Sequence, residues 1–198
     1  MAELAGDGAG MPRVVTILSS LLQRATDRND AERLVSGGAT WRVSAFHGLT
    51  KPSISLRAYL ERIFKYAGCS TSCYVVAYIY LDRFAQRHPS IPFDSLNVHR
   101  FLITSVLLAV KFLDDLYYNN AYFAKVGGIS LMEMNFLEVD LLFGLGFDLN
   151  VTPFTFTTYC SILQREMYLE SPPPVLSKFH CLLSEEESSS CQQKQLIV

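Results

Sequence analysis

Hydrophobic residues are most concentrated at the centre of the chain, in residues 96–115. Eight of the ten positions 101–110 are apolar, and a segment that is apolar on nearly all sides is typical of a helix buried inside a bundle. At about 100° per residue, four of its polar residues fall within roughly 60° of one another. They are Asn97, Arg100, Thr104 and Lys111. The pattern predicts a core helix from Leu96 to Asp115 with one narrow polar stripe, which we expect to meet a functional partner.

Apolar residues recur at helical spacing in several other segments. Those of the main domain are about residues 53–67, 70–88, 130–146 and 152–170. The third begins with Ser130 and Glu133, which have the S-x-x-E spacing of a capping box. Residues 12–26 predict an accessory amphipathic helix that has Pro12 in its first turn. With the core helix, the main domain is expected to be an all-α bundle of about five helices.

The remaining segments lack helical periodicity. Residues 1–11 are Gly-rich and predict a mobile leader, residues 27–51 predict a loop that follows the surface, and residues 117–124 form a short aromatic connection. Three prolines and the run SEEESSS predict a flexible tail from residue 171. The expected organisation is a leader, accessory helix and surface loop over 1–51, the helical domain over 52–170, and the tail over 171–198.

The composition argues against several classes of partner. The 17 basic and 19 acidic residues give a net charge of −2 without a basic cluster, whereas nucleic-acid-binding surfaces are basic. The central apolar run is far shorter than the roughly 20 residues of a membrane span, and the N-terminus does not have the pattern of a secretory signal. The five cysteines lack paired spacing and predict reduced thiols. An intracellular protein of the nucleus or cytoplasm is expected.

Two charged residues stand at positions where the helical pattern predicts burial. Glu138 shares a helix face with several leucines, so its carboxylate needs a partner. Lys111 follows the central apolar run and either lies in a last helical turn with its ammonium in solvent or serves a contact. Taken alone, the position of Glu138 predicts a salt bridge with another residue of the same domain. If both lie on one rim, they can offer a donor and an acceptor to the backbone of a helix from another protein.

The other polar residues suggest structural roles more than chemistry. Arg57 and Asp82, in the first two helices of the domain, predict a structural salt bridge. The four histidines show no paired metal-ligand spacing, and the glycines do not form a phosphate-binding loop. No local signature of a nucleophile and its base is present. We therefore expect a protein that is not an enzyme and has no cofactor or metal.

Four segments in order resemble the signatures of the cyclin box. They are SLRAYLERIF, YLDRF, AVKFLDD and FLEVDLLFGLGFDL. The segments HRFLIT and FLDDLYYNNAYFAKVGGIS are similar to the corresponding segments of the plant P-type (U-type) cyclins, which are related to the phosphate-regulon cyclin of yeast. The resemblance covers about 110 residues and implies a single five-helix cyclin box.

This resemblance implies a regulatory subunit that binds and activates a cyclin-dependent kinase, in cell-cycle or phosphate- and nutrient-linked control. Lys111 and Glu138 would correspond to the Lys and Glu with which cyclins contact the kinase main chain, and Arg57 and Asp82 to the internal pair of the family. Catalysis would belong to the serine/threonine kinase. The alternative is a cyclin-like domain that binds nucleic acid or acts as a transcription-factor adaptor, which the charge balance disfavours.

The chain also departs from the family pattern. Arg100 stands where many cyclins have Leu. The first-helix face that serves many cyclins as a docking patch for substrates contains no Trp here, and its helical stripe favours packing in the core. That face consists of Leu56, Tyr59, Leu60 and Ile63.

Overall fold

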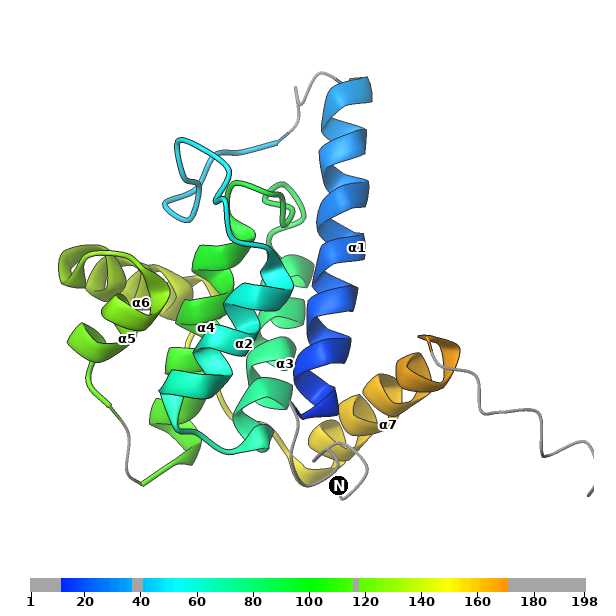
Figure 1. Cartoon of the computed structure of the whole chain (residues 1–198), viewed down its shortest axis with the longest axis vertical. Coiled ribbons are helices and arrows are strands. Elements are labelled where there is room, and N and C mark those ends of the chain that lie inside the picture. Colours follow the sequence, from blue (N-terminus) through cyan, green and yellow to red (C-terminus); the bar gives the residue numbers. More distant parts are fainter. Residues whose placement is uncertain (1–11, 37–40, 116–117, 171–198) are drawn as a thin grey trace, which may run out of the picture.

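The computed structural model describes residues 12–36, 41–115 and 118–170, and within these ranges the chain is all-α (Figure 1). The helices are α1 (Arg13–Ser36), α2 (Leu56–Ala67), α3 (Thr71–Arg87), α4 (Val98–Leu113), α5 (Asn120–Gly127), α6 (Leu131–Gly144) and α7 (Pro153–Glu170). The all-α prediction is confirmed, although the described part of the main domain has more than the expected five helices. The predicted mobile leader and flexible tail lie outside the described residues.

Helix α4 is the centre of the bundle. It packs against α2, α3, α5 and α6, and all ten residues from 101 to 110 are buried, Thr104 and Ser105 included. Burial of a large aliphatic or aromatic side chain contributes about 1.5–3 kcal/mol each, so this helix supplies a large part of the hydrophobic stabilisation. The prediction of a core helix is confirmed, with ends about two residues inside the expected ones.

Helix α1 lies along one side of the bundle and is much longer than the sequence pattern predicted. Its N-terminal half buries five apolar residues and packs on α2, α3 and α7. They are Val14, Val15, Ile17, Leu18 and Leu22. The helix then continues to Ser36. The prediction of a loop was therefore wrong for residues 27–36.

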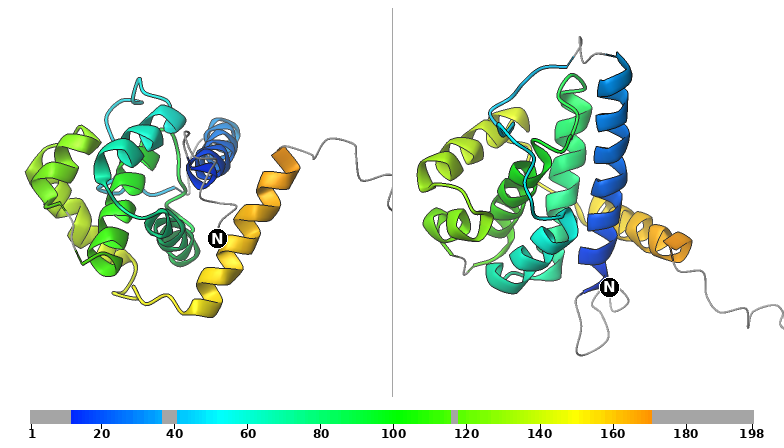
Figure 2. Two further views of the ribbon diagram at one scale, coloured as in Figure 1. Left: turned by 60° about the horizontal axis from the view of Figure 1, so that its bottom comes forward. Right: turned by 45° about the horizontal axis from the view of Figure 1, so that its top comes forward.

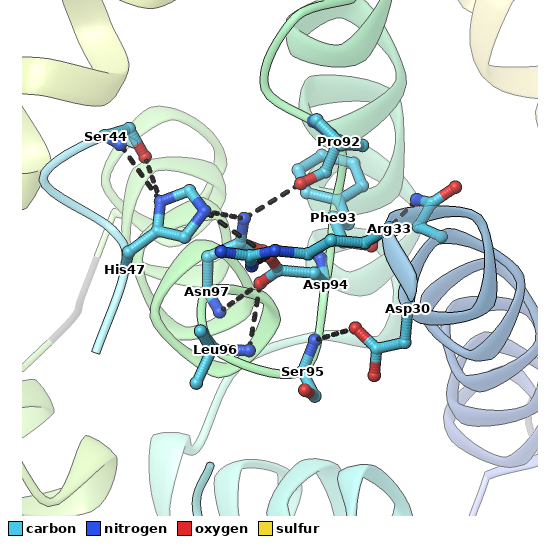
Figure 3. Close-up of polar contacts among 11 residues, drawn as sticks. Asp30, Arg33, Ser44, His47, Pro92, Phe93, Asp94, Ser95, Leu96 and Asn97 are labelled. Atoms are coloured by element: carbon cyan, nitrogen blue, oxygen red, sulfur yellow. Dashed lines mark hydrogen bonds and ion pairs between the residues drawn. The ribbon is translucent and has the colours of Figure 1, made fainter. Parts of the chain in front are cut away.

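The second half of α1 is held by polar contacts (Figure 3). Such contacts produce no hydrophobic periodicity in the sequence. Asn29 donates a hydrogen bond to the Phe93 carbonyl at 2.8 Å, and Asp30 accepts one from the Ser95 amide at 3.1 Å. One turn further on, Arg33 pairs with the buried Asp94 at 2.8 Å. All three partners belong to the segment that precedes α4, so the extension of α1 clamps the start of the central helix.

Asp94 joins this clamp to the segment before α2. Its Oδ1 accepts hydrogen bonds from the amides of Leu96 and Asn97, and its Oδ2 lies 3.5 Å from His47 Nε2 (Figure 3). Burial opposes the charged form, but the hydrogen bonds from His47 and the Leu96 amide, with the charge of Arg33, lower the pKa of Asp94. The carboxylate therefore stays charged and fixes the entry to α4.

Residues 41–51 follow the surface as expected, but only part of the segment is anchored. The Phe46 ring is fully buried and stacks on Phe101 with centroids 3.8 Å apart. Leu49, in the same segment, is fully exposed.

Helix α5 was not predicted. The side chain of Asn119 accepts a hydrogen bond from the Tyr122 amide and caps its start, and Gly128, with φ of 72°, ends it in the left-handed conformation. The helix has only eight residues, too few for a clear period in an aromatic segment. By contrast, the cap predicted at Ser130 is present, with its hydroxyl 3.1 Å from the amide three residues later, and Thr152 caps α7 at the same distance.

Helix α7 covers a different side of the molecule from α5 and α6. It packs on α1 and α3, and the views of Figures 1 and 2 place α5 and α6 at the opposite side of the bundle. An ion pair of 2.9 Å between Arg24 and Glu166 joins α7 to α1. The side of α6 that faces away from the bundle therefore has no helix of the described chain over it.

Candidate partner-binding site

Lys111 and Glu138 meet where α4, α5 and α6 converge. The Lys111 ammonium, in the last turn of α4, lies 2.5 Å from Oε1 of Glu138 on α6. Asn120, at the start of α5, donates a hydrogen bond to Oε2 of the same carboxylate at 2.6 Å. The need of Glu138 for a partner is thus met within the chain, as its position on an apolar helix face indicated. The contact of Asn120 with Glu138 was not predicted from the sequence, because helix α5, which begins at Asn120, was not predicted.

The pair keeps contact with solvent and retains unused hydrogen-bonding capacity. The Lys111 side chain is 29% exposed and that of Glu138 is 14% exposed. An ammonium has three N–H donors and a carboxylate about four acceptor sites, so both groups can bind further atoms without breaking their mutual contact. The arrangement presents a fixed donor and acceptor side by side.

Exposed apolar side chains occur on both helices that carry these charges. Phe112 and Leu113, directly after Lys111, are both more than 40% exposed. Four exposed residues of α6 fall within about 60° of one another at helical spacing and form what we call the α6 stripe. The α6 stripe consists of Met132, Phe136, Val139 and Phe143. Exposed apolar surface of this kind marks an interaction site.

Phe147 extends the α6 stripe past the end of the helix. It is the one non-glycine residue with positive φ in the described backbone, at 58°, and its side chain is 58% exposed. The ring meets that of Phe143 edge to face, with centroids 5.1 Å apart. Such a conformation is unfavourable for a bulky residue and is concentrated at functional sites. Nothing in the helical pattern pointed to Phe147.

The rest of the predicted polar stripe of α4 serves the fold. Asn97 is fully buried beside Asp94 and His47, and the Thr104 hydroxyl donates to the Arg100 carbonyl at 2.8 Å. Arg100 pairs with Glu133 of α6 at 2.6 Å. The polar stripe of α4 therefore divides into Lys111, which is partly exposed beside Glu138 in the last turn, and three residues whose contacts stabilise the fold.

The predicted salt bridge between Arg57 and Asp82 is not formed, because both residues have other partners. Arg57 is exposed and pairs with Glu61 one turn later in α2 at 3.0 Å. Asp82 accepts hydrogen bonds from Gln86 at 2.7 Å and from the Tyr159 hydroxyl of α7. Asp82 thus links α3 to α7, a contact that no sequence pattern indicated.

The apolar face of α2 belongs to the core, as predicted. All four of its residues are at most 3% exposed, which leaves no apolar docking patch there. They are Leu56, Tyr59, Leu60 and Ile63. In the part of the chain that the structure describes, no group of three or more His, Cys, Asp or Glu side chains is placed to hold a metal ion. None of the described helices is long and apolar enough to cross a membrane.

Comparison with known proteins identifies the family. The cyclin family model matches residues 12–149, a span that begins with α1 rather than at the expected boundary near residue 52. The chain is 64% identical to Cyclin-P4-1 of Oryza sativa subsp. japonica over 91% of this chain and 87% of that protein. It is 57% identical to Cyclin-U4-1 of Arabidopsis thaliana over 98% of this chain and 96% of that protein. The chain therefore belongs to the cyclin family of regulatory subunits, and within it to the plant P-type, or U-type, cyclins.

Proposed function

We propose that this chain binds and activates a cyclin-dependent serine/threonine kinase through the surface formed by Lys111, Glu138 and the α6 stripe. The observation that carries the proposal is a fixed donor and acceptor on α4 and α6, the two helices that also expose large apolar side chains. Lys111 donates to a kinase carbonyl and Glu138 accepts from a kinase amide, while the apolar residues cover one face of the kinase's regulatory helix. The chain supplies no catalytic group, and phosphoryl transfer takes place on the kinase.

The free energy of such binding depends on groups that are already in place. The Lys111–Glu138 contact and the bond from Asn120 fix both side chains before the partner arrives, which reduces the entropy lost on association. Removing one member of a hydrogen-bonded charge pair at an interface costs about 2–5 kcal/mol. The apolar surface supplies the remaining affinity.

Binding measurements with candidate cyclin-dependent kinases test the proposal. We expect Lys111→Ala and Glu138→Ala each to weaken binding by about 30-fold or more, which at 1.4 kcal/mol per tenfold corresponds to about 2 kcal/mol. Circular dichroism must show that the variants fold. The matched control is Glu133→Ala, which also breaks an ion pair between α4 and α6, through Arg100, and should leave binding intact.

Two outcomes would contradict the proposal. If the folded Lys111 and Glu138 variants capture kinase as well as the parent chain does, the surface is wrongly assigned. If the parent chain captures none of the kinases and binds duplex DNA tightly at physiological salt, the nucleic-acid-binding alternative is favoured. Kinase assays on the captured complexes, from dividing and from phosphate-starved cells, separate cell-cycle control from nutrient-linked control.

A further inference from the structure

Two cysteines lie side by side at the start of α3. Ser70 is the N-cap residue of this helix, so Cys69 directly precedes the cap and Cys73 is the third helical residue. The residue before an N-cap commonly folds back onto the first turn of its helix. The Cys69 and Cys73 thiols are accordingly close enough for each to affect the pKa of the other, and neither is in a disulfide.

The two thiols have very different environments. Cys73 is fully buried, its Sγ lies 3.4 Å from the Ser70 hydroxyl, and its S–H donates to Asp114 Oδ2 at 3.5 Å. Cys69 is partly exposed. A dissolved reagent can therefore reach Cys69. Cys73 is shielded from solvent, and the carboxylate of Asp114 can accept the proton of its thiol.

The pair is also polarised. The neighbouring Cys73 thiol lowers the pKa of the Cys69 thiol and outweighs the opposing effects of burial and of Asp114. The proximity of Cys69, together with burial, raises the pKa of Cys73. The positive end of the α3 dipole further favours a thiolate at this place. The thiolate is the form of cysteine that attacks peroxides.

A buried hydroxyl next to Cys69 has no hydrogen-bond partner. The Tyr74 side chain is fully buried, its hydroxyl is unsatisfied, and it lies close enough to Cys69 to affect the pKa of that thiol. An unsatisfied buried polar group costs about 1–3 kcal/mol. An oxygen atom added to the Cys69 sulfur would give this hydroxyl a partner.

We propose that Cys69 and Cys73 form an oxidation site at which a hydroperoxide converts the two thiols into a disulfide. The Cys69 thiolate attacks one peroxide oxygen, the O–O bond breaks, and Cys69 becomes a sulfenic acid as hydroxide leaves. Cys73 then gives its proton to Asp114 and attacks the Cys69 sulfur. The S–S bond forms, the S–O bond breaks, and the departing hydroxide takes the proton from Asp114 as water. Two thiols are oxidised and one peroxide is reduced to water.

The disulfide changes the end of the central helix. Asp114 is the C-cap residue of α4, and it loses the Cys73 hydrogen bond when the S–H hydrogen is gone. The end of α4, including Lys111 three residues earlier, is then held less firmly. We expect faster amide hydrogen exchange in residues 110–115 of the oxidised chain than in the reduced chain.

Mass spectrometry of the full chain after treatment with hydrogen peroxide tests the oxidation site. Trypsin releases both cysteines in one peptide, residues 66–83, because Lys65 and Arg83 flank it. We expect this peptide to be lighter by two hydrogens and protected from alkylation until a reductant is added. If residues 66–83 stay fully alkylatable while Cys160 or the cysteines after residue 171 are oxidised first, the proposal is wrong.

Variants separate the steps. Cys73→Ser should leave Cys69 as a sulfenic acid that dimedone traps, and Cys69→Ser should leave Cys73 unmodified. Asp114→Asn should slow disulfide closure by about tenfold or more, as expected on loss of a base. Asp115→Asn, one residue further and exposed, is the matched control and should close at the parent rate. Equal rates for the two aspartate variants would overturn the role given to Asp114.

A further consequence rests on the proposed function. Because the oxidised chain holds Lys111 less firmly, its affinity for the kinase should fall by about tenfold and return on reduction. The thiol measurements need no kinase, so they fail or succeed independently of the proposed function. Kinase binding that is equal for the reduced and the fully disulfide-bonded chain would contradict control of the kinase by this site.

Discussion

Phe147 has a backbone conformation that is unfavourable for its bulky side chain. A left-handed φ costs a bulky residue about 1–2 kcal/mol, and an exposed phenyl ring gains little in return from the fold. Phe147 also lies at the end of the α6 stripe, next to Phe143. The unfavourable conformation is explained if it places an apolar ring where a partner covers it.

Replacing Phe147 by Asn should therefore separate stability from binding. Asn tolerates the left-handed region, so Phe147→Asn should leave the free energy of unfolding unchanged or raise it by up to about 1 kcal/mol. Kinase binding should weaken by at least tenfold. Urea denaturation and binding assays measure the two effects. Phe154→Asn, at an exposed phenylalanine without a positive φ, is the control and should bring no gain. A clear loss of stability in Phe147→Asn would contradict the argument.

For single residues, the sequence predicts that a charged side chain must have a partner better than it predicts which residue that partner is. The position of Glu138 on an apolar face required a partner, and the structure supplies Lys111 and Asn120. Arg57, however, pairs with Glu61 in its own helix and not with the predicted Asp82. An exposed pair one turn apart costs little in geometry, and helical spacing alone cannot rank it against a contact between helices.

Among the elements, α1 shows how polar contacts can extend a helix. Its hydrophobic period ends near residue 26, yet three residues of the second half bind the segment before α4. They are Asn29, Asp30 and Arg33. Contacts of this kind depend on a partner segment some 60 residues away in sequence, so they leave no mark in the local pattern. The accessory helix was predicted, but its length was not.

The Arg33 contact gives a quantitative test of this clamp. Arg33→Ala removes the charged partner of Asp94, which is 1% exposed, and should lower the free energy of unfolding by about 1.5–3 kcal/mol. Arg28→Ala is the matched control in the same helix, since its pair with Glu32 is 3.9 Å long and exposed. The control should change stability by less than about 0.5 kcal/mol. Equal effects in urea denaturation would show that the clamp does not stabilise the fold.

The whole molecule has two unlike sides. On one side α7 covers α1 and α3, and on the other the outward face of α6 remains uncovered in the described chain (Figure 2). The sequence showed that α6 is largely apolar, but a helix that is apolar all round is predicted to be buried. The α6 stripe differs from this expectation, and the difference is physically reasonable when a second protein completes the burial.

A charge placed on the α6 stripe should therefore act on association and not on folding. The Phe136 side chain is 61% exposed, so Phe136→Glu removes few contacts within the chain and should change the free energy of unfolding by less than about 0.5 kcal/mol. It should abolish kinase binding and reduce self-association of the free chain in analytical ultracentrifugation. Leu49→Glu makes the same change of charge at a fully exposed leucine before α2 and should leave kinase binding unchanged. If Phe136→Glu unfolds the chain instead, α6 uses its outer face for its own fold, and the partner must bind elsewhere.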